Sequence, residues 1–164
     1  GNCRNTPVEI FETRYPLRVR EYSLIADSGG AGAMRGGLGT RRILRVEEGA
    51  EVTANALFDR TKPGFGAFGL EGGGKGGYAA IKVKKKGETE FRTFTEVFGT
   101  VSPSKFTNIV LHGGDEVLIE SPGGGGYGDP AERDPERVAR DVFEGFVSPA
   151  AARALYGTGT GAAS

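Results

Sequence analysis

Apolar and polar residues alternate over short stretches through most of the first 120 residues. Such alternation is typical of strands that bury one face. The pattern predicts strands at residues 18–25, 40–46, 50–58, 78–84, 89–97, 106–111 and 115–120. Residues 40–46 and 50–58 are separated only by Glu47-Glu48-Gly49, which predicts an antiparallel hairpin.

The two ends of the chain have other patterns. Residues 1–16 contain two prolines and predict an extended segment anchored by Val8, Ile10 and Tyr15. After residue 130, Asp134 followed by a proline is typical of a helix start. A Ser-Pro pair at 148–149 starts a second predicted helix, and a glycine at 157 ends it.

The predicted fold is mainly β, with glycine-rich antiparallel sheets and two short C-terminal helices, in the range from all-β to α+β. The predicted division is a glycine-rich β domain over 1–130, a helical tail over 131–157 and a disordered end over 158–164. Twenty-nine glycines among 164 residues argue against a helical bundle, because glycine destabilises helix interiors.

Charge and cysteine content narrow the function classes. Twenty-one Lys and Arg balance twenty-one Asp and Glu, so no net field favours a nucleic acid or an anionic membrane as partner. No apolar run approaches the ~20 residues of a membrane-spanning helix, and no signal peptide pattern is present. A single cysteine makes an internal disulfide impossible, and we expect a cytoplasmic protein. The chain begins at Gly1 rather than Met, so we expect a piece of a longer polypeptide.

Two glycine-rich loops imitate phosphate-binding motifs. Residues 64–69 fit G-x-G-x-x-G, and residues 69–75 fit the first seven positions of a Walker A loop. Gly76 stands where Walker A needs Ser or Thr for magnesium, and the following residues predict a strand rather than the helix that phosphate binding requires. We therefore do not expect nucleotide binding at either loop.

A run of four glycines, Gly123, Gly124, Gly125 and Gly126, precedes Tyr127 and Asp129. Such a run costs conformational entropy on folding, so it is either a hinge or a place where another backbone or a ligand approaches closely. Tyr127 and Asp129 either line an interface or cap the helical tail. The sequence leaves both pairs of alternatives open.

Several motifs in a fixed order resemble the C-terminal part of the hydantoinase B family. Those motifs are Asn5-Thr6-Pro7-Val8-Glu9, Arg14-Tyr15-Pro16-Leu17, Asp27-Ser28-Gly29-Gly30-Ala31-Gly32, Arg35-Gly36-Gly37, Asp59-Arg60, Gly69-Leu70-Glu71-Gly72-Gly73, and residues 121–130 with Arg133-Asp134-Pro135. The resemblance covers residues 1 to about 157.

The resemblance implies a part of an ATP-dependent amidohydrolase such as N-methylhydantoinase or 5-oxoprolinase, or of a related acetone or acetophenone carboxylase. It implies a hetero-oligomer in which a hydantoinase A type ATPase subunit holds ATP and Mg and phosphorylates the substrate. The B-type subunit then works on the activated amide, whose carbon water can attack. A non-catalytic module for subunit assembly is the alternative that we keep beside the enzyme.

The family's B-type subunits are about three times longer than this chain, and the resemblance implies a divalent metal in their N-terminal part. That part is also an expected partner of residues 1–164. We place no metal and no cofactor in this chain itself, and we do not expect it to turn over substrate alone.

Three side chains are candidates for the chemistry. Asp59 and Arg60 end a predicted strand before the glycine-rich loop, where side chains can project into a catalytic site; a structural ion pair is the alternative. Arg35 can hold a phosphate or carboxylate through two parallel hydrogen bonds, and its alternative is to pin the loop by donating to carbonyls.

Overall fold

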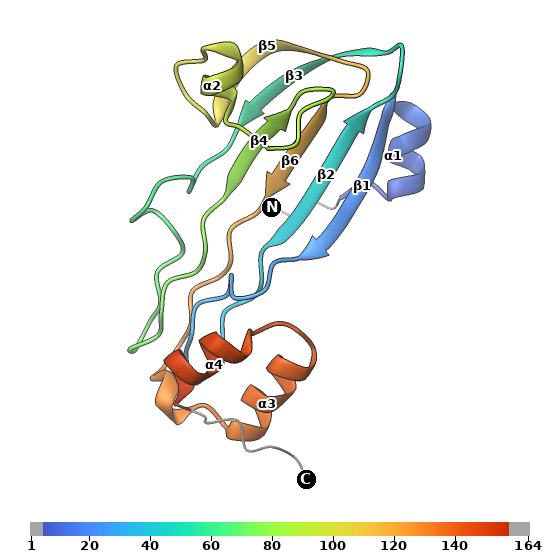
Figure 1. The fold of residues 1–164 in the computed structure, drawn as a ribbon. Helices are drawn as coiled ribbons and strands as arrows, with labels where there is room; N and C mark the ends of the chain where they lie inside the picture. Colours follow the sequence, from blue (N-terminus) through green and yellow to red (C-terminus); the bar gives the residue numbers. More distant parts are fainter. Residues whose placement is uncertain (1–4, 158–164) are drawn as a thin grey trace. The chain divides into compact units, whose positions relative to one another are not determined.

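The computed structural model describes residues 5–157 of the 164-residue chain. Its elements in chain order are α1 (Val8–Arg14), β1 (Leu17–Leu24), β2 (Thr40–Val46), β3 (Glu51–Leu57), β4 (Ala80–Lys84), α2 (Phe94–Phe98), β5 (Lys105–His112), β6 (Glu116–Glu120), the short 3-10 helix η1 (Pro130–Glu132), α3 (Pro135–Phe143) and α4 (Pro149–Tyr156) (Figure 1). The predicted class, mainly β with two C-terminal helices, is confirmed. No helix in the described part of the chain is long and apolar enough to cross a membrane.

Contacts divide the chain into two compact units, each built from three separate segments. The first unit comprises residues 1–22, 42–59 and 80–119, and the second comprises residues 23–41, 60–79 and 120–164. The helical residues 131–157 therefore cluster with two glycine-rich segments from earlier in the chain. The predicted disordered end, 158–164, lies outside the described residues.

The first unit contains the regular sheets. Strands β1, β2, β6 and β4 form one sheet in that order, while β3 pairs with β5 in an antiparallel ribbon. Glu51 lies opposite His112 and Leu57 opposite Lys105, with a bulge between Ala54 and Ala56. The core of the unit is apolar; its buried members are Val46, Ile81, Val83, Phe94 and Leu111.

Three local predictions in this unit were wrong. Residues 40–46 and 50–58 both form strands, but they do not pair with each other, because β2 lies between β1 and β6 while β3 pairs with β5. Residues 8–14 are helical rather than extended, and Ile10 and Tyr15 are exposed rather than anchors. Residues 94–98 form α2 instead of continuing a strand, because Thr93 and Glu96 make a capping box.

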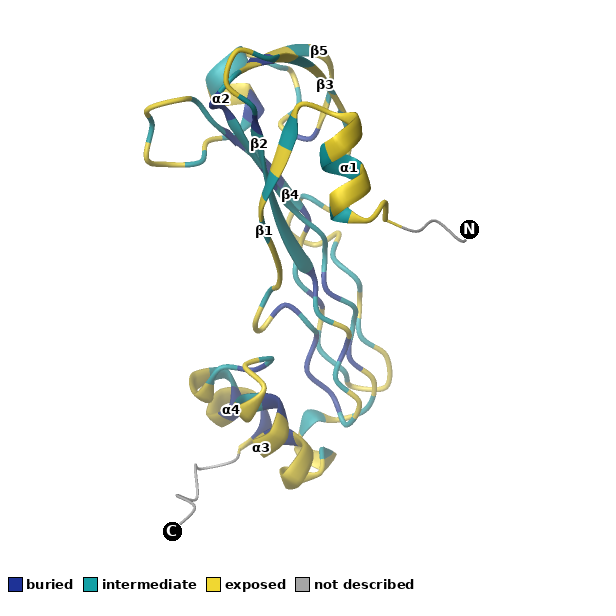
Figure 2. Ribbon diagram, turned by 90° about the vertical axis from the view of Figure 1, so that its right-hand side faces the viewer, coloured by how far each residue is buried: buried dark blue, intermediate teal, exposed yellow. Residues whose placement is uncertain are grey.

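The second unit is built of extended glycine-rich segments and the two predicted helices. Both helices start as expected: Asp134 accepts a hydrogen bond from the Glu136 amide, and Ser148 accepts one from the Ala151 amide. Val138 and Val142 lie on the face of α3 that packs against α4. The buried members of this core are Ala31, Val138, Val147, Ala152 and Tyr156 (Figure 2).

Candidate functional site

Three extended segments of the second unit form a layer of closely spaced backbones, which we call the glycine layer: residues 28–37, 69–77 and 121–128. Its backbone amides and carbonyls bond across the segments, as in Gly30 N to Gly124 O at 2.8 Å and Gly126 N to Gly74 O at 2.9 Å. Residues 121–128 thus bond to both of the other segments, and these two also bond to each other, as in Gly74 N to Ala31 O at 2.6 Å. Figure 2 shows these extended segments running side by side without regular strands.

The four-glycine run is the part of the glycine layer where backbones approach most closely. A Cβ added to Gly123 would overlap the Ser28 carbonyl oxygen, and one added to Gly125 or Gly126 would overlap the carbonyl of Phe68 or Ala31. Gly124 has more room, since its nearest neighbour would be Gly37 N at 3.2 Å. Of the two alternatives left by the sequence, the structure therefore has close approach of another backbone.

Tyr127 lies between two segments of the glycine layer. Its amide and carbonyl both bond to those of Met34, each at 2.9 Å. On the other side, the Leu70 amide donates to the Gly126 carbonyl, and the Leu70 carbonyl accepts from the Gly128 amide. The backbone of Tyr127 is therefore fully used inside the unit, while its side chain is exposed. Its interface role stays a prediction.

Asp129 caps the helical tail. Its side chain accepts a hydrogen bond from the Ala131 amide at 2.9 Å, which begins η1. An aspartate at this position satisfies an amide that the helix itself leaves unpaired. The sequence left an interface role and a capping role open for Asp129, and this contact is the capping role.

Arg35 holds a carboxylate of its own chain. Its Nε donates to Asp141 Oδ2 at 3.0 Å, its Nη2 to Asp141 Oδ1 at 3.2 Å, and its Nη1 to the Gly36 carbonyl at 2.8 Å. The Phe146 ring lies against the guanidinium, 5.5 Å from its carbon to the ring centroid. Most of its donors are therefore already engaged, and contact with a phosphate or substrate stays a prediction.

A second arginine, Arg133, also binds Asp141, and we call Arg35, Asp141 and Arg133 the Asp141 cluster. Arg133 Nη2 donates to Asp141 Oδ2 at 2.7 Å and Nη1 to the Ala33 carbonyl at 3.1 Å, while its buried Nε has no hydrogen-bond partner among the described residues. Burial raises the pKa of Asp141, but the hydrogen bonds and positive charges of Arg35 and Arg133 outweigh it and hold that pKa below its usual range. The carboxylate is thus kept ionised between two cations.

Asp59 and Arg60 belong to different units, Asp59 to the first and Arg60 to the second. Asp59 pairs with Lys105 at 2.9 Å, and both side chains are largely exposed. Arg60 has a φ of 59°, in the left-handed region that non-glycine residues rarely adopt, and its carbonyl accepts from the Ala79 amide at 3.0 Å. The structure thus has the ion pair that was the alternative for Asp59, and the catalytic roles of both residues stay predictions.

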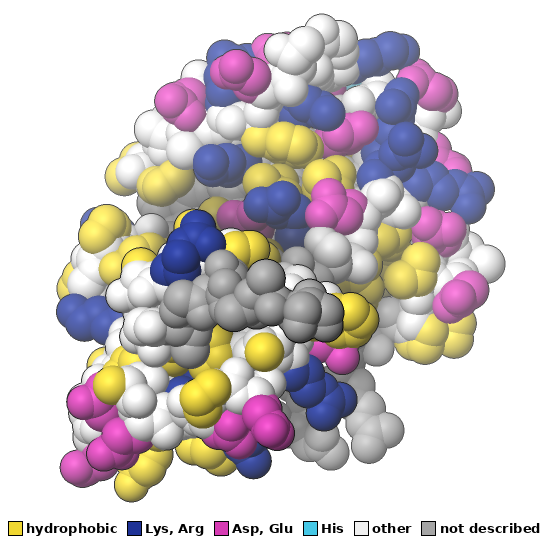
Figure 3. All heavy atoms as spheres, turned by 60° about the horizontal axis from the view of Figure 1, so that its bottom comes forward, with side chains coloured by type: hydrophobic (Ala, Val, Ile, Leu, Met, Phe, Trp, Pro, Cys, Tyr) yellow, Lys and Arg dark blue, Asp and Glu magenta, His cyan; other side chains and the backbone are white. Residues whose placement is uncertain are grey.

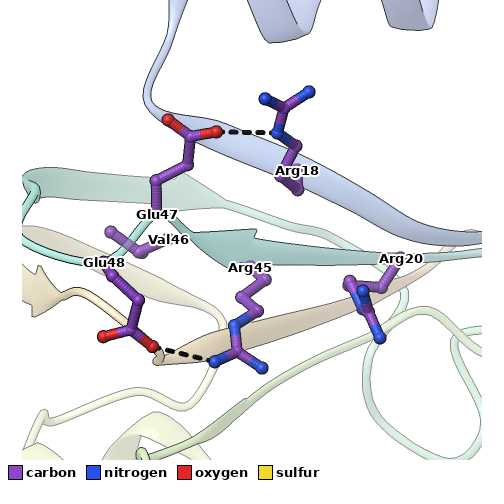
Figure 4. A pocket seen from close by; sticks show the side chains of 6 residues that line it. All are labelled: Arg18, Arg20, Arg45, Val46, Glu47 and Glu48. Atoms are coloured by element: carbon purple, nitrogen blue, oxygen red, sulfur yellow. Dashed lines mark hydrogen bonds and ion pairs between the residues drawn. The ribbon is translucent and has the colours of Figure 1, made fainter.

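The first unit has an open groove of about 390 Å³ between β1 and the end of β2 (Figure 4). Two of its three arginines face acidic partners: Arg18 bonds to Glu47 at 2.7 Å, and Arg45 bonds to Glu48 at 2.9 Å. Among the described residues that line the groove, Arg20 is the one arginine for which Figure 4 draws no ion pair. Because the other two cations are compensated by neighbouring carboxylates, the groove has little net charge with which to attract an anion.

Neither glycine-rich loop of the sequence leads into a helix, since the chain continues from Lys75 through glycines to β4. Within residues 5–157, no three His, Cys, Asp or Glu side chains are grouped as a metal site would require. Residues 82–86 contain four lysines. Lys84 and Lys86 pair with Glu116 and Glu48, both at 2.7 Å, so these lysines are part of the unit's own charge network.

The sequence did not predict which residues contact Arg35 and Tyr127. Asp141 is separated from Arg35 by 106 positions, and no local pattern connects them. Met34 and Leu70 were not singled out because each is an isolated apolar residue in a glycine-rich segment. The capping box of α2 was the one omission with a local signal, the Thr-x-x-Glu spacing of Thr93 and Glu96.

The sequence model of the Hydantoinase B/oxoprolinase family matches residues 1–130. The chain belongs to this family. Two relatives align with nearly all of the chain. The beta subunit of the caprolactamase of Pseudomonas jessenii is 36% identical over 158 residues, or 96% of this chain and 26% of that protein. The B-type subunit of a putative D-/L-hydantoinase of Pseudomonas sp. strain NS671 is 31% identical over 157 residues, or 96% of this chain and 24% of that protein.

The fold of this chain is also present in a solved structure. The crystal structure of the ATP-dependent caprolactamase from Pseudomonas jessenii matches with a TM-score of 0.72 and 28% identity, over 92% of this chain and 24% of that one. The chain therefore spans about a quarter of the length of the relatives that it matches.

Proposed function

We propose that this chain is the C-terminal part of a B-type subunit in an ATP-dependent hydrolase of cyclic amides, which works with an A-type ATPase subunit. The observation that carries the proposal is the similarity to the caprolactamase beta subunit, which extends over both units, from the sheets to the helical tail. Relatives named as subunits also support a hetero-oligomer.

The proposed reaction opens the ring at the expense of ATP. The amide oxygen attacks the γ-phosphorus of ATP, ADP leaves, and the ring carbon becomes electrophilic. Water then adds to that carbon, and the C–N bond of the ring breaks to leave a linear acyl phosphate with a free nitrogen group. A second water hydrolyses the acyl phosphate to the ring-opened acid and inorganic phosphate. ATP and Mg²⁺ are held by the A-type subunit, and a divalent metal belongs to the part of the B-type polypeptide outside these residues.

The role of this chain in the proposed reaction is to build a rigid support. The glycine layer fixes three segments by backbone hydrogen bonds, and the Asp141 cluster attaches α3 to one of them. Rigid support of this kind positions reacting groups that come from elsewhere in a subunit. This is consistent with a part that does not turn over substrate alone.

Carboxylation of a ketone is the second candidate, because this chain is similar to the acetophenone carboxylase delta subunit from Aromatoleum aromaticum. The two are 28% identical over 95% of this chain and 25% of that protein. The two reactions differ in what adds to the activated carbon. Bicarbonate is required only for carboxylation, so its omission separates them.

Affinity purification of the full-length natural protein from its own cells tests the proposal. We expect a co-purifying A-type ATPase, identified by mass, and an ATPase rate that rises at least about ten-fold with caprolactam, hydantoin or 5-oxoproline. A protein that purifies without any ATPase, or an ATPase rate that no cyclic amide changes, would contradict it.

A further inference from the structure

Three apolar side chains form an exposed row across the glycine layer. Tyr127 lies between two paired residues, with Met34 bonded to one edge of its backbone and Leu70 to the other. Residues paired directly across neighbouring extended segments project from the same side of the layer. We call Met34, Tyr127 and Leu70 the apolar row.

The apolar row is exposed although it is large and uncharged. The exposed fractions are 56% for Met34, 54% for Tyr127 and 55% for Leu70. Phe68, two residues before Leu70, is 73% exposed. Figure 3 shows that hydrophobic side chains also reach the surface among charged ones on the face it presents. Contiguous apolar groups on a rigid layer mark a surface that another protein segment covers.

We infer that the apolar row is covered by the rest of the same B-type polypeptide, the part that lies outside these 164 residues. This inference rests on the proposed function, because it assumes that the natural protein has the length of its family relatives. In the matched relatives about three quarters of the polypeptide lies outside the region that matches this chain. A covalently attached partner has an effective concentration that a separate subunit does not reach.

The chemistry of the row fits an occupant in the same subunit. Interfaces that form permanently are apolar like a domain core, whereas transient ones carry a larger polar share. No member of the row is charged, and the one cation that bonds to it among the described residues is the Arg137 guanidinium, which donates to the Met34 sulfur at 3.7 Å. The backbone of the row is held at every position by hydrogen bonds within the glycine layer. The expected occupant is therefore an apolar segment, without a charged centre, that packs on Tyr127 and its two neighbours.

Cysteine labelling of the full-length protein tests this inference. Met34→Cys and Tyr127→Cys each place a thiol in the row, and Arg140→Cys, on the exposed side of α3, is the control. Each variant is treated with a maleimide, once as the B-type polypeptide alone and once with the A-type subunit, and the modified peptide is quantified by mass spectrometry. Two row positions keep the test valid if one variant fails to fold.

We expect both row cysteines to react at least about ten-fold more slowly than Cys at position 140 in the B-type polypeptide alone, at every protein concentration. Fast labelling alone with protection only after the A-type subunit is added would overturn the inference, because that subunit would then cover the row. Protection that grows with protein concentration would overturn it in favour of a second copy. Fast labelling under all conditions would leave the row uncovered and also overturn it.

The labelling result does not depend on catalysis. The same preparations are assayed for cyclic-amide-dependent ATP hydrolysis, which tests the proposed function separately. Protected cysteines in a protein without this activity would refute the proposed function but support the inferred interface. Fast-labelling cysteines in an active protein would refute the interface and leave the proposed function standing.

Discussion

The guanidinium of Arg35 and the carboxylate of Asp141 form a two-point ion pair, with Nε to Oδ2 at 3.0 Å and Nη2 to Oδ1 at 3.2 Å. The pair joins a segment of the glycine layer to α3, and both side chains are largely buried. Removal of Arg35 takes two charge-assisted hydrogen bonds from the buried Asp141 carboxylate and leaves it with Arg133 as its remaining cation, which costs more than an exposed pair contributes.

Arg35→Ala is therefore expected to lower the free energy of unfolding by about 3 kcal/mol. Urea denaturation of the chain measures this loss. Arg140→Ala is the matched control, because its pair with Glu144 is long, at 3.8 Å, and exposed; we expect a change below about 0.5 kcal/mol there. Equal effects of the two substitutions would show that the buried cluster does not stabilise the unit.

Gly126→Ala tests the close approach in the glycine layer. The added methyl group would overlap the carbonyl oxygen of Ala31, so we expect a loss of at least about 2 kcal/mol, or failure to fold. Gly37→Ala is the control, because a Cβ there meets nothing within 4 Å. A tolerated substitution at Gly126 would contradict the backbone spacing of the glycine layer.

These two substitutions also show what the sequence could and could not predict. The helices of the tail have local start and stop signals, so Asp134, Ser148 and Gly157 predicted them correctly. The close approach of Gly126 to Ala31 involves residues 95 positions apart, so the sequence could only offer it beside a hinge.

Strand pairing was not predictable for a similar reason. The short Glu-Glu-Gly connection favoured a hairpin between 40–46 and 50–58. Strand β3 instead pairs with β5, whose paired residues lie 48 (Leu57 to Lys105) to 61 (Glu51 to His112) positions later. Local propensity does not contain that non-local choice. The Arg35 site had the same limit, since the sequence indicated a residue able to bind an anion but not that Asp141 supplies one.

Acid is expected to destabilise both units through two buried carboxylates. Burial raises the pKa of Asp115, but hydrogen bonds from Lys85 and from the amides of His112 and Lys86 outweigh it, so that pKa lies below its usual range, as it does for Asp141. A folded-state pKa below the unfolded value gives stability that is present above about pH 4 and is lost as the pH falls further.

Urea midpoints measured between pH 7 and pH 2.5 check this prediction. The midpoint should be flat down to about pH 4.5 and then fall. Asp115→Asn should lower the midpoint at pH 7 and make the acid fall shallower. A midpoint that rises as the solution is acidified would contradict the sign of both pKa shifts.

Substitutions at Asp59 separate the catalytic role predicted from the sequence from its ion pair. A catalytic Asp59 predicts that, in the natural complex, Asp59→Ala lowers kcat at least about ten-fold with subunit assembly intact, because general acid–base groups contribute at least this much. Lys105→Ala removes only the partner of the ion pair and should leave kcat within two-fold of its original value, about 0.4 kcal/mol. Equal effects of the two substitutions would leave Asp59 with a structural role.

The most direct measurement follows the products of ATP-dependent ring opening in the purified natural complex, without added bicarbonate. We expect one ring-opened acid for each ADP formed, a linear amino acid from caprolactam or 5-oxoproline and an N-carbamoyl amino acid from hydantoin, and no product when ATP is omitted. ATP consumption that requires both a ketone and bicarbonate, with no ring-opened product from any cyclic amide, would contradict the proposed hydrolase and point to a carboxylase.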